Sequence, residues 1–213
     1  MRRIVIDDAA PLAAQLGPAV DAIRRGRVVA FPTDTLYGLA ADPRDERAVE
    51  ALFTVKRRPL ERTVALVADS LAQAEALATL GEQARRLARH FWPGPLTLVV
   101  PAAAGLAGRV QSTEHLVGIR VPDHSVARAL AELCGHALTA TSANRSGEPA
   151  TADPDEVADQ LPEIAVLVDA GRSPGGPPST VVDASTAELR LVREGALPWS
   201  RVLEFLRTPS RLA

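Results

Sequence analysis

The chain has 213 residues, of which 46% are hydrophobic, 23% are charged and only one is cysteine, and its formal net charge is −2. A single domain of this length buries roughly 70% of its unfolded surface, so its core needs no disulfide or structural metal for stability. The lone cysteine excludes an internal disulfide and a cysteine-based zinc site, and no stretch reaches the roughly 18 uninterrupted apolar residues of a membrane span. We therefore expect a soluble, cytoplasmic protein, whose charge balance argues against a generally basic surface but allows a local basic pocket.

Predicted strands and helices alternate along the whole chain. Hydrophobic periodicity indicates, in the first half, a strand at 3–6, a helix at 10–25, a strand at 27–31, a helix from 45 to 56, a strand at 63–68 and a helix at 72–91 that breaks near Gly81. In the second half it indicates strands at 96–100 and 116–121, a helix at 125–134, strands at 137–141, 163–168, 180–183 and 189–192, and a short helix at 200–207. This alternation predicts a single α/β domain over residues 1–213 with a mixed sheet.

Polar residues follow the predicted strand at 27–31, in the stretch from Pro32 to Thr35, with Tyr37 close behind. Loops at strand ends often carry the binding residues of α/β folds, so the hydroxyl groups and carboxylate here are well placed to face a ligand. Proline, aspartate and threonine also form turns that only satisfy their own backbone. This stretch alone leaves both interpretations open.

The chain contains one lysine against 23 arginines, and this residue, Lys56, begins the basic run Lys56-Arg57-Arg58. Lysine is a compact point charge and arginine a planar fork, so a single retained lysine suggests contact with a crowded anion such as a phosphate. Arg62 follows on a predicted loop, because Pro59 cannot continue the helix. The alternative is that these cations complement the helix dipole or form a solvated face.

Two further stretches place polar residues within or after predicted strands. Arg120 interrupts an otherwise apolar strand, and a buried arginine needs a protein or substrate carboxylate because an unpaired buried charge is costly. Ser142 and Asn144 lie in the polar turn 141–147, which suits close approach to a phosphate or ribose. The four histidines show no metal spacing and are interpreted as surface or turn residues. The residues alone therefore predict an α/β protein whose cationic pocket binds a phosphorylated or carboxylated small molecule, and they indicate no metal site.

Seven stretches, in the same order and at similar spacing, resemble those of the YrdC family. They are Phe-Pro-Thr-Asp-Thr-Leu-Tyr-Gly-Leu (31–39), Lys-Arg-Arg-Pro (56–59), Phe-Trp-Pro-Gly-Pro-Leu-Thr-Leu-Val (91–99), Gly-Ile-Arg-Val-Pro (118–122), Thr-Ser-Ala-Asn-Arg-Ser-Gly (141–147), Ser-Thr-Val-Val-Asp (179–183) and Val-Arg-Glu-Gly (192–195). The resemblance covers residues 10–196 and implies one YrdC-like domain, a twisted mixed sheet around a positively charged cavity, followed by a short C-terminal helix.

The resemblance also implies an activity. It is that of a threonylcarbamoyl-AMP synthase, a nucleotidyltransferase that condenses L-threonine, bicarbonate and ATP to threonylcarbamoyl-AMP and pyrophosphate. The product would pass to the tRNA threonylcarbamoyl-transferase machinery, which modifies adenosine 37 of tRNA, and direct tRNA binding is possible. Mg²⁺ would accompany the ATP.

Roles for particular residues follow from the same resemblance. Thr35 and Arg120 match positions that bind threonine, Arg120 through the carboxylate. Lys56 and Arg58 match a pair that holds the ATP phosphates and would carry catalysis. The positions that match nucleotide-contacting residues are Lys56, Arg58, Arg62, Ser142, Asn144 and Arg193.

The chain departs from the family pattern at a few positions, and other functions compete. The departures are Thr63, Val67, Ala150 and Pro178, which affect the expected threonine-side and outer nucleotide contacts. One alternative is a tRNA- or double-stranded-RNA-binding module without synthase activity, although scarce aromatic residues argue against base stacking. Another is a carbamoyl-transfer domain of the hydrogenase-maturation type, whose zinc-finger neighbours a single cysteine cannot form.

Overall fold

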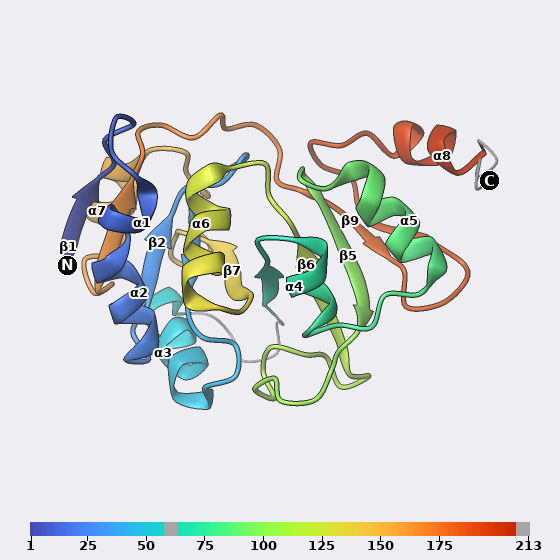
Figure 1. Cartoon of the computed structure of the whole chain (residues 1–213), viewed down its shortest axis with the longest axis horizontal. Coiled ribbons are helices and arrows are strands. Elements are labelled where there is room, and N and C mark those ends of the chain that lie inside the picture. Colours follow the sequence, from blue (N-terminus) through green and yellow to red (C-terminus); the bar gives the residue numbers. More distant parts are fainter. Residues whose placement is uncertain (58–63, 208–213) are drawn as a thin grey trace.

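The strands of the described residues, 1–57 and 64–207 of a computed structural model, form one mixed sheet with helices packed against it (Figure 1). The order across the sheet is β1-β8-β2-β3-β7-β4-β6-β5-β9-β10. The strands are β1 (Arg2–Val5), β2 (Val29–Phe31), β3 (Gly38–Ala40), β4 (Ala65–Val67), β5 (Leu96–Pro101), β6 (Leu116–Arg120), β7 (Leu138–Ser142), β8 (Val166–Asp169), β9 (Thr180–Asp183) and β10 (Arg190–Arg193). The helices are α1 (Leu12–Gln15), α2 (Gly17–Arg24), α3 (Glu46–Lys56), α4 (Leu71–Glu75), α5 (Glu82–Phe91), α6 (Ser125–Cys134), α7 (Pro154–Gln160) and α8 (Trp199–Arg207). The expected α/β class is confirmed.

Strand β7 joins two halves of the sheet. Its first residues pair antiparallel with β4, Leu138 opposite Val67, whereas its last two pair antiparallel with β3, Ser142 opposite Gly38. The strands β1, β8, β2 and β3 lie on one side of β7, and β4, β6, β5, β9 and β10 lie on the other. The polar loop after β7 therefore begins where the two halves meet.

The two faces of the sheet bury different sets of apolar side chains. Alternation in β2 sends Val29 and Phe31 toward α2 and α6, while Ala30 points to the opposite core. That opposite core is the larger of the two and includes the apolar residues of α3 and α5, for example Leu52 and Leu87. Because both faces of β2 are covered, its sequence is a continuous apolar run rather than an alternating one.

Helix ends follow the local sequence. Asp45 caps α3 by accepting a hydrogen bond from the Arg47 N–H at 2.9 Å, and α6 ends at Gly135, whose φ of 79° suits glycine. The single helix expected at 10–25 is in fact two, α1 and α2, because Pro18 near the start of α2 lacks the N–H needed to continue the helical ladder.

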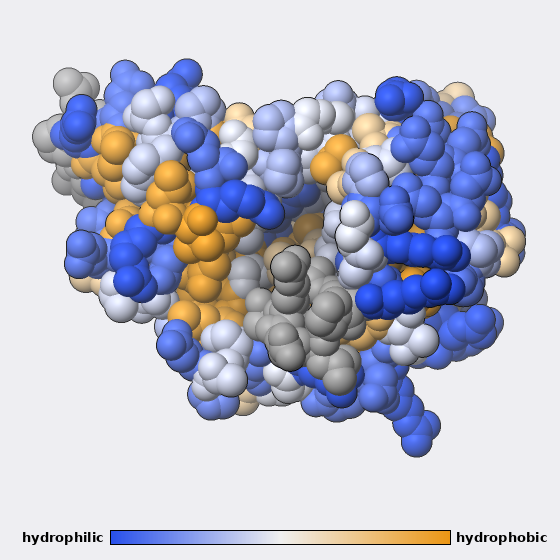
Figure 2. All heavy atoms as spheres, turned by 180° about the vertical axis from the view of Figure 1, so that it is seen from behind, coloured by the Kyte–Doolittle hydropathy of each residue, from blue (hydrophilic) through white to orange (hydrophobic). Residues whose placement is uncertain are grey.

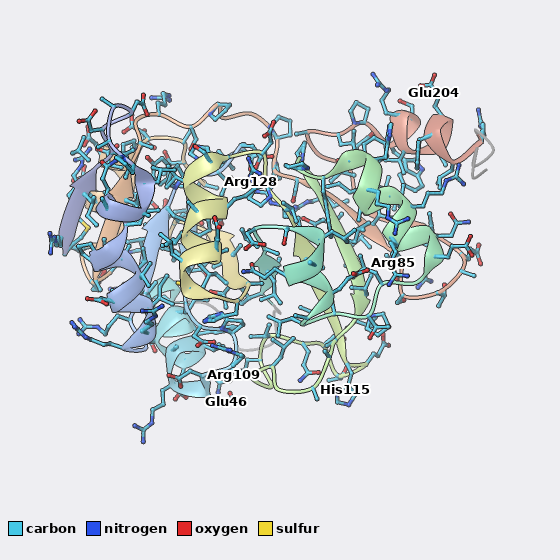
Figure 3. All side chains as sticks on the ribbon, viewed as in Figure 1. Glu46, Arg85, Arg109, His115, Arg128 and Glu204 are labelled. Atoms are coloured by element: carbon cyan, nitrogen blue, oxygen red, sulfur yellow. The ribbon has the colours of Figure 1, made fainter. Side chains whose placement is uncertain are left out.

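The halves are also tied together along one edge. Glu46 at the start of α3 accepts a hydrogen bond from the Gly108 N–H at 2.7 Å, and the neighbouring Arg109 lies 3.8 Å from Glu50; Figure 3 shows Glu46 and Arg109 close together at this edge. At the far end, α8 packs on α5 through Phe205, whose ring stacks on His90 with centroids 4.1 Å apart.

Seen from behind, the surface is hollowed near its centre, and a band of hydrophobic side chains runs along the half that carries β5, β9, β10 and α8 (Figure 2). Leu191 and Val192 of β10 are among the exposed apolar residues. Among the described residues, no helix has the length and apolar character needed to cross a membrane.

One sequence-based interpretation holds only in part. His136, interpreted as a surface or turn residue, lies in the bend that follows α6, but it is buried, and its Nε2 lies 3.4 Å from Asp42 Oδ2. The two residues are far apart in sequence, so no local pattern could reveal the contact. Cys134 is buried, and burial raises the pKa of its thiol to about 11, which makes it a poor nucleophile.

Candidate functional site

Small side chains line one face of the central strands. Ala65 of β4 pairs with Ala140 of β7, and Gly118 of β6 lies beside them, since a Cβ added to Gly118 would be 3.6 Å from the Ala65 Cβ. All three residues remain partly exposed although their strands are central. We call Ala65, Gly118 and Ala140 the floor. Arg120 and Ser142 project from the same face, because each lies two residues beyond a floor residue on its strand.

Lys56, at the end of α3, lies beside the loop that follows β7. Its Nζ donates to the Ser142 carbonyl at 2.5 Å, to Ser142 Oγ at 3.2 Å, to the Asn144 carbonyl at 3.1 Å and to Asn144 Oδ1 at 2.9 Å. The side chain is only 3% exposed. The Ser146 N–H in turn donates to the Lys56 carbonyl at 2.8 Å. The lysine therefore fixes the Ser142–Asn144 loop directly.

The loop is further ordered by its own side chains. Ser142 Oγ donates to Asn144 Oδ1 at 2.5 Å, and the Asn144 amide donates to the Arg145 carbonyl at 3.1 Å and to the Glu148 carbonyl. Asn144 thus uses its acceptor toward Lys56 and Ser142 and its two donors toward the backbone. The predicted nucleotide contacts of Ser142 and Asn144 remain a prediction, but the structure brings both residues to the cation expected beside them.

Arg120 forms an ion pair with Asp34, the residue before Thr35. Arg120 Nη2 lies 3.3 Å from Asp34 Oδ1, and the two side chains are 9% and 10% exposed. Burial lowers the pKa of Arg120; the Asp34 carboxylate opposes this shift and the nearby Arg193 cation adds to it. The sequence alone allows either a protein or a substrate carboxylate as the partner of Arg120, and in the structure that partner is the carboxylate of Asp34.

Arg193 lies on the edge strand β10. Its Nη2 donates to the Ser179 carbonyl at 2.9 Å, and the Ser179 hydroxyl is 2.8 Å from Thr97 Oγ1. Thr97 reaches the floor, because a Cβ added to Gly118 would be 3.3 Å from its Cγ2. Burial lowers the pKa of the Arg193 guanidinium, which remains cationic at neutral pH. Arg193 and Arg120 thus approach the same region from different strands.

Thr35 lies on the loop between β2 and β3. Its Oγ1 is 3.1 Å from Thr33 Oγ1, and Thr33 Oγ1 also donates to the Leu36 carbonyl at 2.7 Å. The Thr35 carbonyl accepts from the Gly175 N–H at 2.8 Å, which ties the loop to the glycine- and proline-rich stretch 171–178. The stretch satisfies part of its own backbone, as the turn interpretation predicts, and also places Thr35 next to the Asp34–Arg120 pair.

The structure brings most of the predicted site residues to one region and adds Asp34. Arg58, Arg62 and Thr63 lie outside the described residues. Asp34 and Ser179 fall within stretches that the sequence singled out, but nothing in their types or spacing marked them as partners of Arg120 and Arg193. The Asp34–Arg120 pair joins residues that are 86 apart in sequence, and the Arg193–Ser179 contact joins residues that are 14 apart.

Comparison with known proteins places the chain in a family. The family model described as "Telomere recombination", which covers the Sua5, YciO and YrdC proteins, matches residues 21–195. The chain belongs to the Sua5/YciO/YrdC family. The resemblance inferred from seven short stretches is confirmed.

Individual Sua5/YciO/YrdC relatives are similar along most of this chain. A threonylcarbamoyl-AMP synthase of Vibrio cholerae is 40% identical over 190 residues, 86% of this chain and 99% of that protein. One of Pyrococcus abyssi is 38% identical over 182 residues, 84% of this chain, but the match spans only 54% of that protein. The match thus extends along nearly all of one relative and about half of the other.

Solved structures of family members agree. The Pyrococcus abyssi Sua5 structure complexed with L-threonine superposes with a TM-score of 0.88 at 35% identity, covering 97% of this chain and 60% of that chain. Escherichia coli YciO gives a TM-score of 0.81 at 27% identity, covering 92% of this chain and 96% of that chain. HypF structures are below 20% identical and show a shared fold alone.

Proposed function

We propose that this chain is a threonylcarbamoyl-AMP synthase, which condenses L-threonine, bicarbonate and ATP to threonylcarbamoyl-AMP and pyrophosphate. Relatives carrying that name are 38–40% identical over most of the chain, and a Sua5 structure of the same fold holds L-threonine. One observation carries the proposal. The buried guanidinium of Arg120 and the loop at Ser142 and Asn144, which Lys56 orders, lie on the same open face of the sheet.

The chemistry needs positioned groups rather than a covalent nucleophile. The amine of threonine and bicarbonate form a carbamate with loss of water, and a carbamate oxygen then attacks the α-phosphorus of ATP as pyrophosphate leaves. This second step makes the enzyme a nucleotidyltransferase. Such a step depends on alignment of the reactants and on cations that offset phosphate charge. We assign the phosphates to Lys56 and Arg58 with support from Arg62 and Arg193, and the threonine to Thr35 and Arg120.

Mg²⁺ is proposed as the companion of ATP. Among the described residues, no group of three or more His, Cys, Asp and Glu side chains is placed to hold a metal ion. The phosphate oxygens and water would therefore supply most of its ligands, as is usual for Mg²⁺ in nucleotide sites. Its contribution when bound is to offset charge on the phosphates.

The product is proposed to pass to the machinery that modifies adenosine 37 of tRNA, and the reaction is proposed to take place in the cytoplasm. The RNA-binding alternative is not favoured, because relatives that are 38–40% identical over most of the chain are named as synthases. Direct tRNA contact in addition to synthesis remains part of the proposal.

Pyrophosphate release tests the function. We expect release from ATP only when threonine and bicarbonate are both present, measured with each added singly and together. Serine and glycine serve as controls for the amino acid. Equal release with serine, with glycine or without an amino acid would exclude threonine as the substrate. Salt-dependent RNA binding without any ATP turnover would instead support the RNA-binding alternative.

A further inference from the structure

The Asp34–Arg120 pair leaves much of its hydrogen-bonding capacity unused. Three buried atoms of the pair have no hydrogen-bond partner within the described part of the chain. They are both carboxylate oxygens of Asp34 and the Nη1 of Arg120. The single close approach, Nη2 to Oδ1 at 3.3 Å, is an ion pair without hydrogen-bond geometry. Two buried charges that lack hydrogen bonds carry a large desolvation cost.

A purely structural ion pair would not be built this way. Buried polar groups in folded proteins are hydrogen-bonded in the great majority of cases, and an exception calls for an explanation such as a missing ligand. The half-exposed Arg3 is a contrast, since it donates to Asp169 at 2.8 Å and to Asp155 at 2.6 Å. Asp34 and Arg120 therefore have the properties of groups prepared for a ligand.

The charges around the pair are mixed. Asp34 faces Arg120 and also acts on His124, the residue before α6, where burial lowers the pKa and Asp34 and Asp123 act against that shift. Arg120 faces Asp34 and is repelled by Arg193. A ligand entering between Asp34 and Arg120 thus meets an anion on one side and cations on the other.

An α-amino acid zwitterion matches this arrangement. Its carboxylate offers acceptors that Arg120 Nη1 can use, and its ammonium group, on the neighbouring carbon, offers three donors for the two Asp34 oxygens. A simple carboxylate would be drawn to Arg120 but repelled by Asp34. A neutral polar ligand could hydrogen-bond to both groups but would offset neither charge.

We infer that Asp34 binds the ammonium group of the amino-acid substrate and thereby selects zwitterions over simple carboxylates. The inference rests on the proposed function, since it names a further binding residue for the same substrate. Asp34 and Arg120 together then form one recognition unit, each matched to one end of the zwitterion.

The test compares two ligands that differ only at nitrogen. L-Threonine and 2,3-dihydroxybutanoate share the carboxylate and the side chain, but the second carries a hydroxyl group in place of the ammonium. Binding of each to the unmodified protein and to Asp34→Asn is measured by calorimetry. We expect threonine to bind at least tenfold more tightly than its analogue to the unmodified protein, and this preference to shrink at least tenfold in Asp34→Asn.

A matched control removes a nearby charge that is exposed. Asp123→Asn also deletes a carboxylate beside His124, and its preference for threonine should stay within twofold of that of the unmodified protein. If Asp34→Asn weakens both ligands by the same factor, Asp34 only positions Arg120 and the inference is wrong. The inference can also be tested if Asp34→Asn fails to fold. Equal affinity of the unmodified protein for threonine and its analogue would overturn the inference. Failure to bind threonine at all, or pyrophosphate release that ignores threonine, would instead overturn the proposed function.

Discussion

At the scale of single residues, Lys56 shows why one lysine remains among 23 arginines. Its ammonium group lies among four oxygen atoms of Ser142 and Asn144, each within 3.2 Å. A compact cation on a thin stem fits such a cage, whereas a planar guanidinium is larger and directs its donors in a fixed fork. The composition pointed to a crowded anion; in the structure the oxygens around Lys56 Nζ belong to Ser142 and Asn144, and its contact with phosphate stays a prediction.

Lys56→Arg should therefore lower both activity and stability. We expect at least a tenfold fall in turnover, about 1.4 kcal/mol of transition-state stabilisation, because the Ser142–Asn144 loop would be displaced. We also expect a lower melting temperature, since overpacking a buried site costs about 1–3 kcal/mol. Pyrophosphate release and thermal unfolding check the two effects. The exposed neighbour Arg57→Lys is the matched control, and a fully active Lys56→Arg enzyme would show that the lone lysine is an accident of composition.

Arg120→Lys separates charge from geometry in the threonine site. The variant keeps a cation beside Asp34 but loses the fork, so threonine affinity should fall by more than tenfold while ATP affinity changes little. Arg120→Ala should cost threonine binding about 2–4 kcal/mol and should also destabilise the fold, because Asp34 would be left buried without a counter-ion. Calorimetry with each ligand measures the affinities, with the exposed Arg190→Lys as control. Equal losses for threonine and ATP would contradict a role specific to threonine.

At the scale of elements, the floor depends on small residues at central strand positions. A Cβ added to Gly118 would lie 3.3 Å from Thr97 Cγ2, a tight contact, and 3.6 Å from Ala65 Cβ, an ordinary one. Larger side chains there would rise into the space that faces Arg120. The strand alternation that buries Val117 and Ile119 leaves Gly118 and Arg120 on this open face.

Gly118→Val should block ligand binding more than it affects folding. We expect affinity for ATP or threonine to drop at least tenfold, because the isopropyl group occupies the floor, while the melting temperature falls only modestly. Gly17→Val is the control, since a Cβ at Gly17 meets nothing within 4 Å. Unchanged affinity for both ligands in Gly118→Val would place the site elsewhere. Thermal-shift titration with each ligand provides the measurement.

Elements with strong local signals were predictable, and weak or long-range ones were not. Periodicity and turn residues placed α6 and β9 at their observed bounds, 125–134 and 180–183. The three-residue strand β3 was missed because a stretch this short has no detectable period. Helix α7 was also missed, although Asp153 as cap and Pro154 at its first turn are a recognisable start signal. The site cations could be found from sequence, but the contacts of Lys56 and Asp34 could not, because they join distant segments.

At the scale of the whole molecule, the proposed substrates contact both halves of the sheet. Asp34 and Thr35 lie on the loop after β2, whereas Arg120 and Arg193 lie on β6 and β10 across β7. Bound ligands should therefore hold the halves together and raise the stability of the fold.

Ligand-induced stabilisation can be given a size. A ligand at 100 times its dissociation constant adds about 2.7 kcal/mol to the free energy of unfolding. We expect ATP and threonine each to raise the melting temperature, and Arg120→Lys to lose the effect of threonine while keeping that of ATP. The free amino acids arginine and alanine, added at the same concentration as threonine, control for non-specific effects on the melting temperature. A threonine effect that persists in Arg120→Lys would contradict the assignment.

The split pairing of β7 has a consequence for how the chain unfolds. The backbone enters the β4–β10 half, returns through α6, β7 and β8 to complete the first half, and then crosses again to supply β9 and β10. The first half has all its strands only after β8 is in place, the second only after β9 and β10 are, and β7 pairs with a strand of each half. Melting should thus be a single cooperative transition, with equal calorimetric and van't Hoff enthalpies. Loss of pairing at β7 would therefore disrupt both halves of the substrate site at the same time.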